Sequence, residues 1–285
     1  MQAYPEQHSP LAKKLLQYPG ATKQNLPAGQ SPQQDLADAL DNIFNHPNVG
    51  PFISKQLIQK LVTSNPSPEY VARVTAKFNN DGTGKRGNLA AVVKAILLDA
   101  EARPSSVAAT TGKVNEPLLR LTQLWRAYGA QAANGQYRIG NINAVFGQGP
   151  LQSPSVFNFF SPFYAPPGEI ADQGLVAPEL QIATEYLNTT VTNTFYNVIF
   201  FWNSTVPGLP ANAIVIDVSQ EVALAGDSEV LVNRIAEKLL GGTISPTLKA
   251  EAKAAMERVP ATNAGQRVSE AMYLIASSPE YVVSR

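Results

Sequence analysis

The chain has 285 residues, 44% of them hydrophobic, and its 22 Lys and Arg residues balance 22 Asp and Glu residues. This composition predicts a globular protein and offers no basic surface for nucleic acid or an anionic membrane. There is no cysteine and there are only two histidines, His8 and His46, so disulfides, thiolate ligands and multi-histidine metal sites are excluded. No cofactor is expected. The longest strongly apolar run, Val198 to Trp202, is too short to cross a bilayer, and Met1 is not followed by a signal-peptide pattern.

Residues 1–30 are rich in proline and predict an irregular N-terminal arm, with one short helical possibility at 11–16. A helical unit is expected over 31–129. Ser31 fits the N-cap of its first helix, and Pro32 fits the first helical position. The apolar residues at three- and four-residue spacing predict the buried face of this helix: Leu36, Leu40, Ile43 and Phe44.

Three further amphipathic helices are predicted between residues 49 and 103, separated by Asn65-Pro66 and by a polar, glycine-rich loop over 79–87. Ser67 and Asn88 are the expected N-caps of the second and third. A linker follows at 104–112, and then a helix over about 116–128. The expected core positions of the three helices are Phe52, Ile53, Leu57, Leu61 and Val62; Val71, Val74 and Phe78; and Leu89, Val92, Val93, Ile96 and Leu97.

Residues 130–176 lack a sustained period and predict an irregular segment rich in aromatic residues and proline. The segment 177–285 predicts a long helix from Pro178 to about Trp202, followed by a second helical unit with helices near 228–240, 246–258 and 265–278. Residues 213–218 alone have strand-like density, although 218–225 is also compatible with a short helix. The fold class is therefore mainly α: an irregular multi-helix domain of about eight helices, compact over 31–285, with at most a minor strand.

The last three helices resemble the three over 49–103 in sequence. Lys60-Leu61-Val62 lies 178 residues before Lys238-Leu239-Leu240, and Ser67-Pro68 lies 178 before Ser245-Pro246. At an offset of 179, Val92, Ile96 and Glu101 match Ala271, Ile275 and Glu280. Two related three-helix units would explain these matches. The alternative is chance similarity between ordinary amphipathic helices, because Ser-Pro is a general helix start.

Several stretches together resemble the uncharacterised bacterial family known as domain of unknown function 1800. They are LDNIFNHPNVGPFISKQLIQKLVTSNPSPEYVARVTAKF, RGNLAAVVKAILLDAEAR, GKVNEPLLRLTQLWRAYGA, SPSVFNFFSPFYAP and RVSEAMYLIASSPEYVVSR. The resemblance implies a helical fold and often an exported protein, periplasmic or extracellular, encoded beside a sulfatase-like partner. Family members are usually longer, so the chain resembles their C-terminal part. The family implies no activity.

Two loop motifs favour structural interpretations. Gly82-Thr83-Gly84-Lys85 suggests a phosphate-binding loop, but Asn79 and Arg86 occupy positions that need glycine and Ser or Thr. Asn79, Asp81 and Gly82 mimic the middle of a calcium loop whose first and last carboxylates are missing. A plain turn is predicted, and no metal site.

Three polar residues are candidates for a polar site. His46 could act as a general base, but no nucleophile motif accompanies it, so we expect it to cap a helix end. Glu116 and Arg120 are four residues apart on a helix, and a surface ion pair is predicted; burial at a cleft would instead point to function.

The densest aromatic cluster is the candidate binding segment: Phe157, Phe159, Phe160, Phe163 and Tyr164. If exposed, it would form a stacking platform for a sugar or a partner protein; burial as a loop packed on the helices is favoured. Whether the chain is an enzyme is left open. The leading hypothesis is a non-catalytic interaction or assembly domain of an exported bacterial protein. Its expected partner is the family's N-terminal part or a protein encoded nearby, or else polysaccharide. The alternative is part of an enzyme, such as a hydrolase of surface polysaccharide, whose site needs the N-terminal part.

Overall fold

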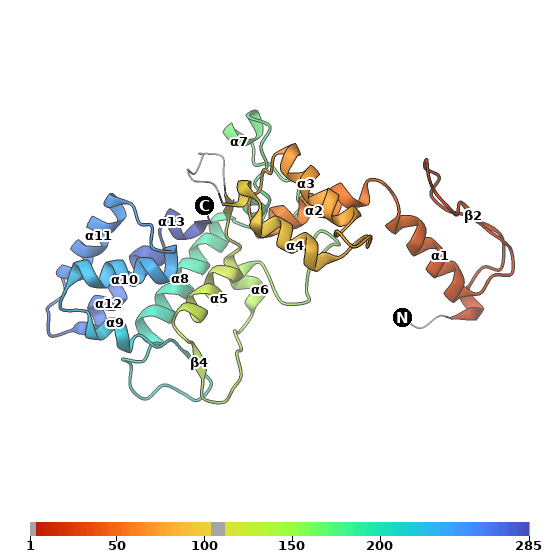
Figure 1. The fold of residues 1–285 in the computed structure, drawn as a ribbon. Coiled ribbons are helices and arrows are strands. Elements are labelled where there is room, and N and C mark those ends of the chain that lie inside the picture. The colour runs from red at the N-terminus through yellow and green to blue at the C-terminus, as the bar shows by residue number, and fades with distance from the viewer. Residues whose placement is uncertain (1–3, 104–111, 285) are drawn as a thin grey trace. The chain divides into compact units, whose positions relative to one another are not determined.

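The computed structural model describes residues 4–103 and 112–284, and the chain divides into two compact units, 1–106 and 107–285. Both units are mainly helical, as predicted (Figure 1). The first unit contains α1 (Pro32–Phe44), α2 (Val49–Leu61), α3 (Pro68–Asn79) and α4 (Leu89–Leu98). The second contains α5 (Pro117–Ala127), α6 (Ile142–Phe146), α7 (Glu169–Asp172), α8 (Glu185–Phe201), α9 (Ser219–Ala223), α10 (Ser228–Leu240), α11 (Pro246–Glu257), α12 (Ala264–Ala276) and α13 (Pro279–Val282). Short 3-10 turns cover Pro5–Gln7, Ala100–Ala102 and Pro178–Gln181.

The strands of the described residues are two-residue antiparallel pairs. In the first unit β1 (Lys13–Lys14) pairs with β2 (Asn25–Leu26). In the second, β3 (Lys113–Val114) pairs with β6 (Val283–Ser284), and β4 (Gln131–Ala132) pairs with β5 (Ile214–Val215). The minor strand expected within 213–218 is therefore present, and α9 follows it. The helical possibility at 11–16 is wrong, because Lys13 and Lys14 form a strand of the arm.

Helices α2, α3 and α4 pack on one another around a small core that includes Tyr70, Val74 and Ile96. Ser67 and Asn88 cap α3 and α4 as predicted. The predicted core residues Phe52 and Leu61, like Leu89 and Leu97, are exposed instead. The buried face of α2 contains Gly50, Ser54 and Ile58. The absence of a side chain at Gly50 lets α2 approach Thr75 and Phe78 of α3 closely.

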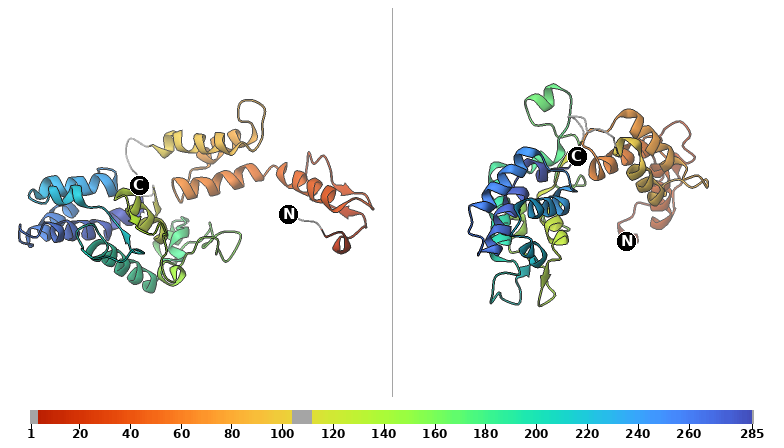
Figure 2. Two further views of the ribbon diagram at one scale, coloured as in Figure 1. Left: turned by 90° about the horizontal axis from the view of Figure 1, so that it is seen from below. Right: turned by 60° about the vertical axis from the view of Figure 1, so that its left-hand side comes forward.

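Helix α1 buries its polar face against the arm. Its buried residues are Asp35, Asp38 and Asn42, whereas Leu36, Leu40, Ile43 and Phe44, the predicted buried face, are 39–56% exposed. Asp35 pairs with Lys13 (2.6 Å) and His8 (2.8 Å), and Asp38 pairs with Lys23 (2.5 Å). These ion pairs explain the reversal, since they need the carboxylates to face the arm. In Figure 2, α1 and the arm extend away from the α2–α4 group.

The second unit is built on a core of α5, α8, α10 and α12. Helix α8 begins at Glu185, with Thr184 as N-cap, rather than at Pro178, which starts a separate 3-10 turn. Apart from α6 and α7, the segment 130–176 has little helix, as expected. The predicted helical unit over 31–129 is divided, because α5 buries Leu121 and Leu124 in the core of the second unit.

The two helix triplets, α2–α4 and α10–α12, share a burial pattern. In each triplet all three helices contact one another. Positions 178 apart are buried in both, as in Ile58 and Ala236, or Val74 and Ala252; Ile96 and Ile275, 179 apart, are also fully buried. Leu61 and Leu239 break the pattern, because Leu61 is 45% exposed and Leu239 is buried. Burial at the core-facing positions is what the repeat hypothesis predicts, whereas the unequal burial of Leu61 and Leu239 is not.

Candidate functional site

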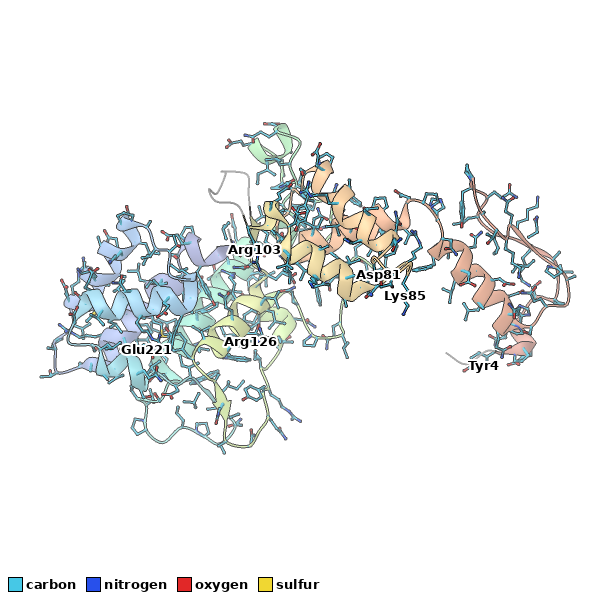
Figure 3. The ribbon with its side chains drawn as sticks, in the orientation of Figure 1. Tyr4, Asp81, Lys85, Arg103, Arg126 and Glu221 are labelled. Atoms are coloured by element: carbon cyan, nitrogen blue, oxygen red, sulfur yellow. The ribbon has the colours of Figure 1, made fainter. Side chains whose placement is uncertain are left out.

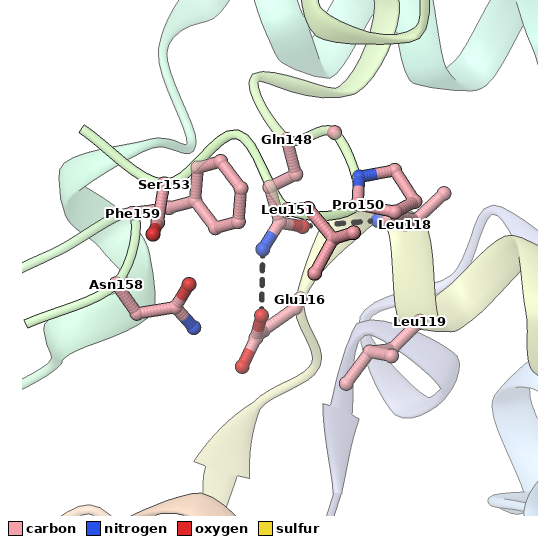
Figure 4. A pocket seen from close by; sticks show the side chains of 10 residues that line it. Glu116, Leu118, Leu119, Gln148, Pro150, Leu151, Ser153, Asn158 and Phe159 are labelled. Atoms are coloured by element: carbon pink, nitrogen blue, oxygen red, sulfur yellow. Dashed lines mark hydrogen bonds between the residues drawn. The ribbon is translucent and has the colours of Figure 1, made fainter. Parts of the chain in front are cut away.

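The N-terminus of α5 carries a buried carboxylate. Glu116 is the N-cap residue, and its Oε2 accepts a hydrogen bond from Gln148 Nε2 at 2.6 Å. Gln148 Oε1 in turn accepts from the backbone N–H of Leu118 at 3.2 Å (Figure 4). The Gln148 amide thus connects the carboxylate to the first turn of the helix, whose dipole favours a negative charge there.

A pocket of about 350 Å³ opens beside this carboxylate. Its lining is largely apolar, with a few polar groups, which is the usual composition of a ligand site. The lining residues are Glu116, Leu118, Leu119, Gln148, Gly149, Pro150, Leu151, Ser153, Asn158 and Phe159. Glu116 and Phe159 were both selected from sequence, and the structure brings them to one pocket (Figure 4). We refer to it as the Glu116 pocket.

The wall of the Glu116 pocket includes two residues in a left-handed backbone conformation. Leu151 has φ 61° and Asn158 has φ 73°. Asparagine tolerates this region, whereas for leucine it is unfavourable and signals local strain. Asn158 closes a turn in which its N–H donates to the Ser155 carbonyl at 3.1 Å. The turn places Phe159, the next residue, in the pocket lining.

The aromatic segment is neither fully exposed nor fully buried. Phe160 is 3% exposed, whereas Phe157 and Phe163 are 39% and 59% exposed. Phe159 and Tyr164 are half-buried, and the Tyr164 carbonyl accepts from the Ala177 N–H at 2.9 Å. The segment therefore supplies one aromatic ring, Phe159, to the pocket and leaves two others at the surface.

The three polar candidates lie in different places. Glu116 and Arg120 are both buried, so the predicted surface ion pair is wrong: the carboxylate bonds Gln148 instead, and Arg120 lines a different pocket. His46 is in the first unit. Its Nδ1 accepts from the backbone N–H of Asn48, the N-cap of α2, and its ring packs edge-on against Tyr18. The predicted role at a helix end fits this contact.

In the loop between α3 and α4, where Figure 3 labels Asp81 and Lys85, the carboxylate of Asp81 accepts hydrogen bonds from nearby residues of the same loop. Asp81 Oδ1 accepts from the N–H groups of Thr83 (2.8 Å) and Lys85 (3.3 Å), and Asp81 Oδ2 accepts from Asn88. These bonds, led by the one from Asn88, hold the pKa of Asp81 well below its usual range. This geometry is that of the predicted turn.

Comparison with known proteins identifies the family. The profile described as "protein of unknown function (DUF1800)" matches residues 1–283. The chain belongs to the DUF1800 family. No curated protein and no solved structure matches it significantly. In the described part of this DUF1800 chain, no helix is long and apolar enough to span a membrane, and no cluster of three or more His, Cys, Asp or Glu side chains could hold a metal ion.

Three features of the candidate binding surfaces were not found from sequence: Gln148, the apolar stripe of α1, and Asn158. Gln148 is 32 residues from Glu116, and nothing local to it indicates that it is buried. The exposed apolar stripe of α1 was assigned to the core, because amphipathic spacing shows which face is apolar but not what covers it. Asn158 alone had a signal, since asparagine is enriched in left-handed turns.

Proposed function

We propose that the chain is a non-catalytic interaction and assembly domain of an exported bacterial protein, and that it binds a partner protein through α1. The observation that supports this is the exposed apolar stripe of Leu36, Leu40 and Ile43. Spacing of i, i+4 and i+7 is the pattern by which an amphipathic helix enters an apolar groove of another protein. Export is part of the same proposal and rests on the family resemblance.

Charge favours a protein partner over a membrane surface. Helix α1 contains Asp35, Asp38 and Asp41 and no Lys or Arg. Interfacial helices that bind anionic lipid carry basic residues on their polar face. In α1 the polar face is acidic and is occupied by the arm, so only the apolar stripe is open to a partner.

The test replaces two stripe residues in the full-length chain. Leu36→Gln with Leu40→Gln should reduce binding of a hydrophobic dye and any self-association seen by sedimentation velocity. Stability should change by no more than about 0.5 kcal/mol, because both side chains are exposed. Ala37→Gln, at an exposed position of the same helix, is the matched control. A monodisperse native chain that binds no dye, or a large loss of stability in the double variant, contradicts the proposal.

A second candidate function is polysaccharide binding at the Glu116 pocket. A carboxylate, two amides and an aromatic ring can meet sugar hydroxyls and the apolar face of a pyranose ring. Hydrolysis usually requires two carboxyl groups flanking the glycosidic bond, and Glu116 is the one carboxylate among the pocket's described lining residues. This composition supports binding over the hydrolase alternative.

Glycan binding is tested with Phe159→Ala and Glu116→Gln on an immobilised glycan array. Phe159→Ala should weaken retention about tenfold on any glycan that the native chain binds, because one aromatic contact is lost. Phe163→Ala removes an exposed ring outside the pocket and should leave retention unchanged. Equal losses in both Phe variants would place glycan binding elsewhere.

A further inference from the structure

Arg120 is a buried cation with no acidic partner among the described residues. The residue is 8% exposed, and its Nε is buried without a hydrogen-bond partner. Its carbonyl accepts from the Tyr281 hydroxyl at 2.6 Å. None of the ion pairs found among the described residues involves its guanidinium, and no carboxylate is among the groups that shift its pKa. Burial lowers the pKa of Arg120. Desolvating a charge is costly unless it is paired, so a structural role alone gives no reason to place arginine here.

Arg120 lines a pocket of about 330 Å³ that shares no lining residue with the Glu116 pocket. Its lining residues come from α5, from α8 and from residues 276–283. Its polar lining is Arg120, Asn188, Thr192 and Ser277, and its apolar lining is Val191, Phe195, Ala276, Pro279, Val282 and Val283. We refer to it as the Arg120 pocket.

We propose that the Arg120 pocket binds a carboxylate that carries an apolar body. Guanidinium groups pair with carboxylates through two parallel hydrogen bonds, and burial strengthens this pairing. A single cation with hydroxyl and amide neighbours matches one negative charge better than the two charges of a phosphate. The valine and phenylalanine walls would take the apolar body, which is either a small organic acid or the C-terminal residue of a peptide.

The first experiment titrates the full-length chain with hexanoate and, separately, with hexanamide, which has the same body without the charge. Hexanoate should raise the melting temperature of the native chain, and hexanamide should not, because a ligand stabilises the state that binds it. In Arg120→Met the hexanoate shift should disappear, while the unliganded melting temperature stays equal or rises, since an unpaired buried charge is removed. Arg126→Met, at an exposed position of α5 (Figure 3), should keep the native response.

The second experiment distinguishes the two sources of the carboxylate. Short peptides that end in valine are compared with their C-terminal amides by calorimetry. Tighter binding of the free acid than of hexanoate supports a peptide terminus, and weaker binding supports a small organic acid. The proposal is overturned if hexanoate leaves the native chain unchanged, or if it stabilises Arg120→Met as much as the native chain.

Discussion

Asp35 and Asp38 hold the N-terminal arm on α1 and thereby leave the apolar stripe of the helix uncovered. Hydrogen bonds from Lys13 and Lys23, respectively, are the largest causes that lower the pKa of these two carboxyls. Their stabilising contribution is complete above the unfolded pKa of about 3.9 and is lost as the pH falls through the lower folded value. The contacts of the arm should therefore be intact at neutral pH and lost in acid.

Neutralising both carboxyls at pH 7 should mimic acid. In the double variant Asp35→Asn, Asp38→Asn we expect faster tryptic cleavage after Lys14 and Lys23. The arm loses the ion pairs that Lys13 and Lys23 make with the two carboxyls, so it is held less tightly on α1. Asp41→Asn changes an exposed carboxyl on the same helix and should leave cleavage unaltered. Equal cleavage of the double variant and the native chain would mean that the remaining bonds, such as Tyr18 Oη to the Asn42 carbonyl at 2.6 Å, suffice to hold the arm.

Glu221 in the second unit is another carboxylate that is held by basic side chains. Its carboxylate is fully buried, 2.8 Å from Lys238 Nζ and 3.7 Å from Arg234 Nε. Lys238→Met should cost about 3 kcal/mol of unfolding free energy, because it leaves a buried carboxylate with the weaker partner alone. Adding Glu221→Gln should recover part of that loss. Urea unfolding of the single and double variants measures the coupling, and additive losses would show that the pair contributes nothing.

For single residues, the sequence predicted interactions between residues close together in the chain but not interactions between residues far apart in it. Ser31, Ser67 and Asn88 were predicted as caps because a cap acts within three residues of itself. Glu116 was selected, but its partner Gln148 could not be, since 32 residues separate them. The partners of Asp35 come from an arm that has no periodic pattern of its own.

At the scale of elements, the two helix triplets share a polar contact as well as their core positions. The backbone N–H of Ser67, the N-cap of α3, donates to Glu101 Oε1 at 2.8 Å. The backbone N–H of Ser245, the N-cap of α11, donates to Glu280 Oε2 at 3.0 Å. Sequence alone paired these serines and these glutamates across the triplets, and the structure joins each serine to its own glutamate.

Removing either glutamate should loosen its own triplet. Glu101→Ala should cost about 1–2 kcal/mol, because a charge-assisted bond is lost at a partly exposed site. Glu280→Ala should cost about 1 kcal/mol by the same reasoning. Hydrogen exchange should rise in α3 for the first variant and in α11 for the second. Faster exchange in the other triplet would argue against equivalent local roles.

Periodicity located the helices but did not always identify their buried faces. It succeeded for α5, where Leu121 and Leu124 are fully buried. For α2 it selected Ile53 and Leu57, which are half-buried against the core, but it missed Gly50 and Ser54 on the fully buried face. Close approach of two helices favours small residues at the contact, and a hydrophobicity pattern does not detect them. For α1, partly buried ion pairs with the arm outweighed the apolar stripe.

At the scale of the whole molecule, each unit has a hydrophobic cluster of its own. Ile96 belongs to the cluster of α2–α4, and Ile275 belongs to the cluster of the second unit; both are fully buried. A unit with its own core can unfold as a cooperative body. We therefore expect two transitions in calorimetry of the full chain.

Cavity variants assign those two transitions. Ile96→Ala and Ile275→Ala should each cost roughly 2–5 kcal/mol, since each removes three carbons from a fully buried site. The first should lower only the transition of residues 1–106, and the second only that of 107–285. Leu61→Ala and Leu89→Ala, at exposed positions of the α2–α4 group, should change either transition far less than Ile96→Ala does. If both isoleucine variants lower one shared transition equally, the two clusters unfold as a single cooperative body, and the boundary at 106 has no energetic meaning.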